Sequence, residues 1–86
     1  MASQKALQKE HAWKNASPIR GKDSDLYRQD SQGNEIYKHS YGKYSPMGWQ
    51  IDHKNPISNG GSEHLRNIQA LQSHENARKS DKYPYK

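Results

Sequence analysis

The sequence predicts a small α+β domain, and three stretches of its 86 residues carry that prediction. Residues 1–16 are rich in helix formers and have Ser3 as a possible N-cap. Residues 26–40 hold two runs, LYRQD and EIYKHS, on either side of Ser-Gln-Gly-Asn, which is a pattern typical of a β-hairpin. Residues 48–82 have the pattern of a strand, a long loop, a strand and a helix. We expect one domain over residues 1–86, with the first helix and hairpin in about 1–47 and a core unit in about 48–82.

The composition allows only a thin hydrophobic core. Apolar residues make up 29% of the chain, and there is no Phe. Cys is also absent, so neither a disulfide nor a thiolate zinc site can reinforce so short a chain. Because the apolar residues of 1–16 form no continuous stripe, we expect a short or frayed helix there, and turn-rich residues 17–25 are expected to be irregular.

The net charge of +5 favours a polyanionic partner, with a merely solvated basic surface as the alternative. No apolar run approaches the roughly 20 residues of a membrane span, so no membrane partner is expected. No signal peptide is recognisable, which makes a cytoplasmic location the default expectation. The oligomeric state is not predicted.

The core unit has a recognisable order of elements. The alternation in Trp49–His53 predicts a strand with Trp49 and Ile51 on its buried face. The loop 54–66 contains Asn-Gly-Gly, which suits a sharp reversal, and residues 67–71 are expected to form a second short strand. A helix should follow from residue 73, capped by Ser73 and ended by Pro84.

Polar residues that suit metal-assisted phosphodiester hydrolysis are concentrated in this unit. They are Asp52, His53, Asn67, Asn76 and Lys79. Carboxylate and carboxamide oxygens are hard ligands that suit Mg²⁺ or Mn²⁺. An imidazole with an ordinary pKa near 6.5 can take a proton from water at neutral pH. A single cation could then stabilise the charge that develops on the phosphate.

The spacing DH-x2-P-x3-GG-x5-N-x8-N-x2-K, with N-I-Q-A-L at residues 67–71, resembles the HNH endonuclease family in its H-N-N variant. The resemblance implies the family's ββα-metal finger, preceded here by a short helix and a β-hairpin. It implies that His53 is the general base and that Asp52 and Asn76 hold one divalent cation, most often Mg²⁺ with Mn²⁺ as an alternative. It also implies that Asn67 orients His53 and braces the loop.

His74 competes with Asn76 for the last position of the motif. Residues two apart on a helix project about 200° from one another, so the two side chains cannot face one ion. The spacing favours Asn76; a site with His74 as ligand would lean toward Zn²⁺ or Ni²⁺.

Two features depart from the family pattern. In a regular strand Asp52 and His53 point to opposite faces, so we expect the strand to end or twist at Asp52. Many family members hold a structural zinc with four cysteines, but Gln72 and Glu75 stand where the second pair would lie. No structural zinc is therefore expected, and the first helix and hairpin should supply the missing packing.

Basic residues of the unit are the expected phosphate contacts, with solvated surface charge as the alternative for each, and Lys79 is the expected added cation near the scissile phosphate. The others are Lys54, Arg66, Arg78 and Lys82. The expected substrate is double-stranded DNA, with RNA not excluded, and a toxin domain would have an inhibitor protein as a further partner. Two other functions stay open: a catalytically inactive nucleic-acid-binding module of the same fold, and a basic protein-interaction module.

Overall fold

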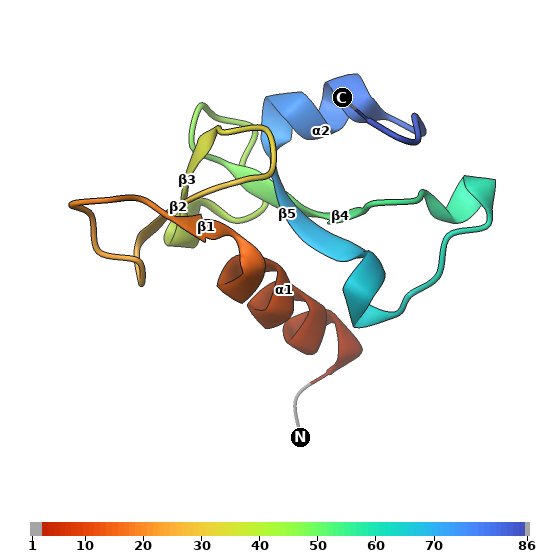
Figure 1. The fold of residues 1–86 in the computed structure, drawn as a ribbon, viewed down its shortest axis with the longest axis horizontal. Helices are drawn as coiled ribbons and strands as arrows, with labels where there is room; N and C mark the ends of the chain where they lie inside the picture. The colour runs from red at the N-terminus through yellow and green to blue at the C-terminus, as the bar shows by residue number, and fades with distance from the viewer. Residues whose placement is uncertain (1–2, 86) are drawn as a thin grey trace.

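The computed structural model describes residues 3–85, which form one helix, two small antiparallel sheets and a short second helix (Figure 1). The first sheet has the order β1-β2-β3 and the second pairs β4 with β5. In chain order the elements are α1 (Gln4–Asn15), β1 (Ser17–Pro18), β2 (Tyr27–Gln29), β3 (Glu35–Tyr37), β4 (Trp49–His53), β5 (Ile68–Gln72) and α2 (Ser73–Lys79). The α+β class is thereby confirmed. No helix within residues 3–85 combines the length and apolar character that crossing a membrane requires.

Helix α1 is longer and better packed than its sequence suggested. It runs for 12 residues, and the Ser3 hydroxyl accepts a hydrogen bond from the Ala6 amide at 3.1 Å, which confirms the predicted cap. Its C-terminal half buries Ala12 and Trp13, and the Trp13 ring centroid lies 5.4 Å from that of Trp49. The expectation of a short or frayed helix was wrong. The contact of Trp13 with Trp49 of the second sheet stabilises the helix, although its apolar residues form no continuous stripe.

The predicted β-hairpin is present as β2 and β3, with Arg28 opposite Ile36. The turn between them closes where the Asp30 amide donates to the Asn34 carbonyl at 2.9 Å. Residues 17–25 were expected to be irregular, but Ser17–Pro18 pairs with β2 as the short strand β1. The reason is that β3 covers only one edge of β2, and the chain passes the other edge directly after α1.

The second sheet and α2 follow the predicted order with shifted boundaries. Strand β5 spans 68–72 and not 67–71, because Asn67 ends a 3-10 turn, Leu65–Asn67. The Gln72 side chain caps α2 by accepting from the Glu75 amide at 2.9 Å, so the prediction of Ser73 as cap was wrong. The helix ends at Lys79 and not at Pro84, since Ser80 adopts a left-handed backbone with φ of 49°.

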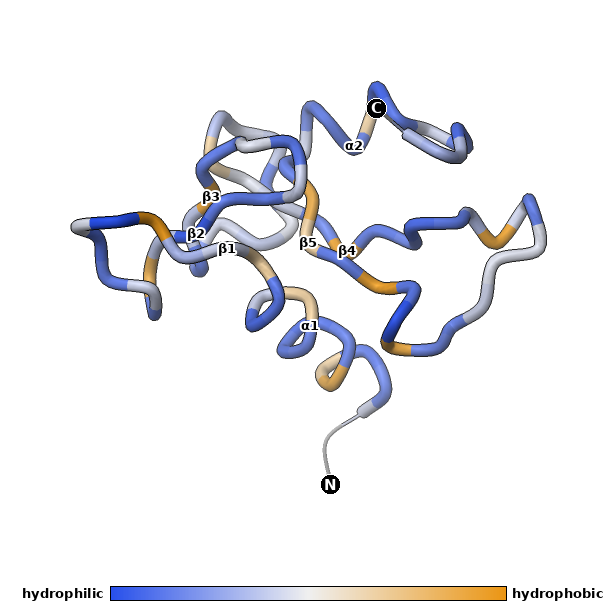
Figure 2. The backbone as a smooth tube through the Cα atoms, viewed as in Figure 1, coloured by the Kyte–Doolittle hydropathy of each residue, from blue (hydrophilic) through white to orange (hydrophobic). Residues whose placement is uncertain are grey.

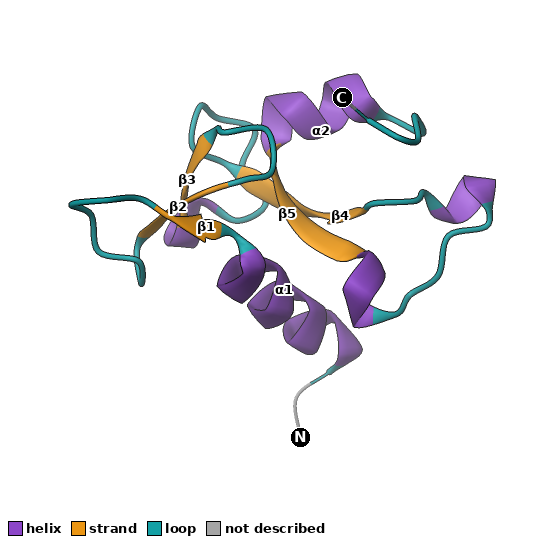
Figure 3. Ribbon diagram, in the orientation of Figure 1, coloured by secondary structure: helices purple, strands orange, loops and turns teal. Residues whose placement is uncertain are grey.

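The hydrophobic core lies between α1 and the second sheet. Figure 2 shows apolar segments along β4 and β5, and Figure 3 shows α1 and α2 on either side of that sheet. Trp49 is fully buried at the centre of the core, and its indole nitrogen donates to the Tyr37 carbonyl at 3.0 Å. The buried apolar cluster consists of Ala12, Trp13, Ala16, Ile36, Trp49, Ile68 and Ala70.

A polar cluster, which we call the Asp30 network, joins the β2–β3 turn to the start of α2. The Asp30 carboxylate accepts from the backbone amides of Asn34 at 2.8 Å and Gln72 at 2.9 Å. The Asn34 side chain donates to Asp30 at 3.2 Å and to Glu75 at 3.1 Å. Gln72 and Glu75, the residues at the positions of the family's cysteines, thus take part in hydrogen bonds that tie the two sheets together.

Candidate functional site

Four of the five predicted catalytic and metal-binding residues line one hollow of about 250 Å³ between the end of β4 and α2. Asp52 and His53 reach it from β4, and Asn76 and Lys79 reach it from α2. The remaining lining residues are Ile51, Pro56, Ile57 and Ser80. The structure therefore brings residues of β4 together with residues of α2 that are 23 or more positions away in the motif. We call this cavity the β4–α2 hollow.

Asp52 is almost fully buried, with 6% of its surface exposed, and both of its carboxylate oxygens have a partner. Oδ1 lies 3.2 Å from the Lys79 ammonium, and Oδ2 accepts from the Gln69 amide at 2.8 Å. Gln69 stands opposite Asp52 in the β4–β5 pairing, which puts both side chains on the face that α2 covers. The sheet register thus fixes where the carboxylate points.

Lys79 is not the free surface cation that the sequence suggested. Its side chain is 1% exposed, and its ammonium also donates to the His53 carbonyl at 2.9 Å. Direct contact with a substrate phosphate would require this buried ion pair to open. In the arrangement described, Lys79 instead neutralises Asp52 and fixes the end of β4 against α2.

The His53 imidazole is partly exposed and is held by an acidic residue that the motif does not contain. Its Nε2 lies 2.7 Å from the Glu63 carboxylate. Gln8 of α1, itself buried, donates to that carboxylate at 3.1 Å. These hydrogen bonds, from His53 first and Gln8 second, lower the pKa of Glu63 below its ordinary value. Because an ionised carboxylate only accepts, the His53 Nε2 donates in this contact; in a neutral imidazole the acceptor is then Nδ1.

The expected break of the strand at Asp52 does not occur. Strand β4 continues through His53, which pairs with Ile68, so the two neighbouring side chains diverge as strand alternation requires. Asp52 turns to Lys79 on α2, and His53 turns to Glu63 and Gln8 on the α1 side. Both residues nevertheless line the β4–α2 hollow.

Asn67 lies outside this hollow and braces the loop after β4. Its side-chain amide donates to the carbonyls of Ser62 at 2.7 Å and Asn55 at 3.0 Å, and its carboxamide oxygen accepts from the Asn55 amide at 2.9 Å. The predicted bracing of the loop is therefore confirmed. In the described part of the chain no side-chain hydrogen bond joins Asn67 to the His53 ring; the connection is the Lys54 amide, which donates to the Asn67 carbonyl at 2.7 Å.

Asn76 and His74 point apart, as their helical spacing predicts. Asn76 lines the β4–α2 hollow together with Asp52. The His74 ring packs edge-on against Tyr44, with ring centroids 4.2 Å apart. Of the two competitors, only Asn76 shares a cavity with the carboxylate.

The donor set of this hollow suits one hard, weakly held cation. Within residues 3–85 no three His, Asp or Glu side chains gather closely enough to hold a metal ion by themselves. Asp52 and Asn76 offer two oxygen donors, which is the number Mg²⁺ usually takes from a protein when waters and phosphate complete its shell. Since Lys79 cancels the charge of Asp52, the protein side of the site is close to neutral and gives an ion little binding energy without a phosphate.

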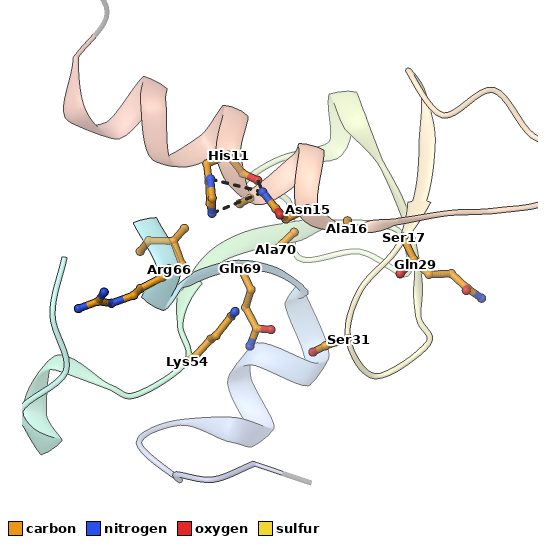
Figure 4. A pocket seen from close by; sticks show the side chains of 12 residues that line it. His11, Asn15, Ala16, Ser17, Gln29, Ser31, Lys54, Arg66, Gln69 and Ala70 are labelled. Atoms are coloured by element: carbon orange, nitrogen blue, oxygen red, sulfur yellow. Dashed lines mark hydrogen bonds between the residues drawn. The ribbon is translucent and has the colours of Figure 1, made fainter. Parts of the chain in front are cut away.

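The basic residues predicted to contact phosphate lie in two places: two of them line a cavity beside α1, and two lie near or beyond the end of α2. Lys54 and Arg66 line a second, larger cavity between α1 and β5 (Figure 4). Arg78 is engaged by Glu75 at 3.2 Å, and its pKa is raised first by that hydrogen bond. Lys82 lies exposed beyond the end of α2.

Three residues that sequence reasoning missed support the site: Gln8, Glu63 and Gln69. Each acts through a hydrogen bond to a motif residue or to its partner. Gln8 and Glu63 are 55 residues apart, so no local pattern could have joined them. Gln69 alone had a signal, because a strand paired with β4 must place some residue opposite Asp52.

No protein-family model, curated protein or solved structure matches the chain. The resemblance to the HNH family therefore rests on the motif residues and their spacing.

Proposed function

We propose that this protein is a divalent-metal-dependent endonuclease of the HNH type that hydrolyses DNA phosphodiester bonds. The observation that carries the proposal is the shared β4–α2 hollow, in which Asp52, His53 and Asn76 meet. The order of β4, loop, β5 and α2 is the order a ββα-metal finger requires, which supports the same reading.

His53 has the position and chemistry of a general base. With Nε2 committed to Glu63, Nδ1 takes the proton of the water that attacks phosphorus. The bond to the 3′ oxygen of the strand then breaks, so the ends are a 5′-phosphate and a 3′-hydroxyl, as the resemblance implies. Glu63 holds the imidazole in one tautomer, and Asn67 holds the loop that carries Glu63 at its far end.

Asp52 and Asn76 are the residues that would hold the cation, Mg²⁺ first and Mn²⁺ second. When bound, such an ion supplies Lewis-acid stabilisation of the phosphate and of the departing oxygen. Lys79 lies 3.2 Å from the Asp52 carboxylate and neutralises its charge in this buried position. Because the protein site is close to neutral, we expect the ion and the DNA phosphate to bind together.

The decisive experiment is cleavage of supercoiled plasmid by the full chain with Mg²⁺, Mn²⁺, Zn²⁺ or Ni²⁺, and with no metal. We expect nicking with Mg²⁺ and Mn²⁺. In His53→Ala the rate should fall by about 10²- to 10⁴-fold while DNA binding survives. His64→Ala is the matched control. His64 is an exposed histidine of the loop after β4, and it does not line the β4–α2 hollow.

A catalytically inactive DNA-binding module is the second candidate. One observation favours it, namely that both oxygens of Asp52 already have protein partners. Salt-dependent DNA binding without metal-dependent cleavage would select this candidate. A chain that neither cuts nor binds DNA would instead be a basic protein-interaction module, and labelled RNA in the same assay tests the alternative substrate.

A further inference from the structure

A cavity larger than the β4–α2 hollow lies elsewhere in the described residues. A cavity of about 470 Å³ lies between α1 and β5, and we call it the α1–β5 hollow (Figure 4). That volume is within the roughly 300–1,000 Å³ of small-molecule sites. One wall is apolar and almost completely buried, and consists of Ala12, Ala16, Ile68 and Ala70.

The charge of the α1–β5 hollow has one sign. Lys54 and Arg66 both line it, and no Asp or Glu does. Within the described residues, neither cation lies within 4.0 Å of a carboxylate, whereas Lys14, Lys22 and Arg78 each pair with a glutamate. In a chain with 9 acidic residues, this cavity is a place where a phosphate meets positive charge without competition.

Three carboxamides provide the hydrogen-bonding groups of the same cavity: Asn15 from α1, Gln29 from β2 and Gln69 from β5. Their nitrogens are engaged, with Asn15 donating to the His11 carbonyl at 2.9 Å and Gln69 to Asp52 at 2.8 Å. Gln29 makes a longer bond to the Gly33 carbonyl at 3.4 Å. No residue of the part described donates a hydrogen bond to any of the three carboxamide oxygens. Acceptors therefore remain available for a ligand with N–H donors.

We propose that the α1–β5 hollow binds one unpaired nucleotide of a nucleic-acid strand. The base lies against the apolar wall, its amino group donates its two hydrogens to the carboxamide oxygens of Asn15 and Gln69, and its phosphate lies between Lys54 and Arg66. The base has to be unpaired, because the faces of a paired base are stacked on its neighbours and cannot lie against the wall.

This inference rests on the proposed function for its ligand class and adds a substrate feature to it. The α1–β5 hollow adjoins the β4–α2 hollow, because Lys54 follows His53 directly and Gln69 donates to Asp52. A strand that reaches the β4–α2 hollow can therefore place a neighbouring nucleotide in the α1–β5 hollow. The preferred substrate is then DNA with an unpaired or displaced nucleotide beside the cut.

The experiment is a nuclear magnetic resonance titration of the ¹⁵N-labelled full chain without divalent metal. The ligands are dAMP, dCMP, dTMP and inorganic phosphate. We expect dAMP and dCMP to shift the side-chain amide signals of Asn15, Gln29 and Gln69 and to bind about tenfold more tightly than inorganic phosphate. Thymine has no amino group, so dTMP should bind several-fold more weakly than dAMP.

Variants locate the site and exclude a general charge effect. Arg66→Ala and Asn15→Leu should each weaken dAMP binding by about fivefold or more. Arg20→Ala is the control, because Arg20 is an exposed arginine that does not line the cavity, and it should leave binding unchanged. The amide spectra of the same samples show whether each variant is folded.

Equal shifts with inorganic phosphate and dAMP would overturn the inference, since the cavity would then be a simple anion site. Nucleotide-induced shifts confined to other parts of the chain would overturn it as well. Plasmid cleavage is measured separately: an active nuclease with no shifts in the α1–β5 hollow removes only this inference. A chain that binds dAMP there and cuts no DNA keeps the nucleotide site and removes the proposed nuclease.

Discussion

Two aspartates of this protein are almost equally buried and have very different surroundings. Asp30 is 4% exposed and Asp52 is 6% exposed. Asp30 accepts four hydrogen bonds, from the amides of Gln32, Asn34 and Gln72 and from the Asn34 side chain, at 2.8–3.2 Å. Asp52 has two partners, Lys79 and Gln69, and it lines the β4–α2 hollow.

The difference shows which buried carboxylate has capacity left for a ligand. An ionised carboxylate offers about four lone-pair positions, and Asp30 uses them all within the protein. Asp52 uses two and shares its cavity with the Asn76 amide. Burial by itself does not separate a structural carboxylate from a functional one; the count of donors and the adjoining cavity do.

The largest expected effect on stability is that of Asp30→Ala. The substitution leaves four N–H donors without this acceptor, and it removes the contact of the β2–β3 turn with Gln72 at the start of α2. We expect the free energy of unfolding, measured by urea denaturation, to fall by about 3–4 kcal/mol. For a chain of this size that is a large share of the total.

Asp25→Ala is the control for this measurement, because Asp25 is an exposed aspartate of the loop before β2. Its free energy of unfolding should change by less than about 0.5 kcal/mol. If Asp30→Ala were as stable as Asp25→Ala, the hydrogen bonds of Asp30 would not contribute to the stability of the fold.

The second prediction concerns Asp52 and Asn76, the two proposed ligands of the cation. Asn76→Ala removes one of the two proposed oxygen ligands at little cost to α2, since Ala is a good helix former. We expect Mn²⁺ affinity, measured by calorimetry in the presence of a short DNA duplex, to fall about 10- to 100-fold. Asp52→Ala should weaken Mn²⁺ binding at least as much, although it also leaves the Lys79 ammonium buried without its partner.

His74→Ala is the matched control on the same helix, because its ring packs on Tyr44 and not in the β4–α2 hollow. It should leave Mn²⁺ affinity unchanged. Unaltered affinity in both Asn76→Ala and Asp52→Ala would remove the ligand assignment, and a loss in His74→Ala would reverse the choice between Asn76 and His74.

The order of elements and the position of Asn76 were accessible from sequence because both depend on local periodicity. Strand alternation placed Trp49 in the core, and helical spacing separated Asn76 from His74. The β-hairpin was signalled by its turn residues and is present as β2 and β3. These features follow from the chain's own geometry and need no knowledge of tertiary contacts.

The surroundings of both aspartates were not accessible, because they depend on contacts between distant segments. Asp30 receives a hydrogen bond from Gln72, 42 residues away, and a turn aspartate carries no sign of such a partner. Lys79 looked like a solvated lysine in the last turn of a helix, and only packing against β4 makes it the buried partner of Asp52. The same limit hid Gln8 and Glu63, which meet only when α1 lies beside the loop after β4.

The third prediction tests the carboxylate that supports His53. In Glu63→Gln the side chain keeps its size, but its amide can either donate or accept, so it no longer fixes the imidazole tautomer. We expect kcat for plasmid nicking to fall about tenfold, with DNA affinity equal or slightly higher because a surface negative charge is lost. Glu10→Gln, which removes the charge of an exposed glutamate of α1, should leave kcat unchanged and alter DNA affinity no more than Glu63→Gln does.

A double variant shows whether Glu63 acts through His53. If it does, adding Glu63→Gln to His53→Ala should cause no further loss of nicking. An additional tenfold loss in that background would mean that Glu63 contributes in some other way, for example through the shape of the loop.

The smallest expected effect belongs to Glu75, at the outer end of the Asp30 network. Its carboxylate accepts from the Tyr85 hydroxyl, Arg78 and Asn34, and these hydrogen bonds, with Tyr85 first, lower its pKa below the ordinary 4.5. A carboxyl group with a depressed pKa in the folded state stabilises the fold above its unfolded pKa, and that contribution is lost as the pH falls through the folded value. The free energies of unfolding of the wild type and Glu75→Gln, measured by urea denaturation, should therefore differ by less than about 1 kcal/mol at pH 7 and converge as the pH falls below the folded pKa of Glu75. A difference that stayed constant from pH 7 to pH 3 would mean that the charge of Glu75 contributes nothing, and that the network depends on Asp30 alone.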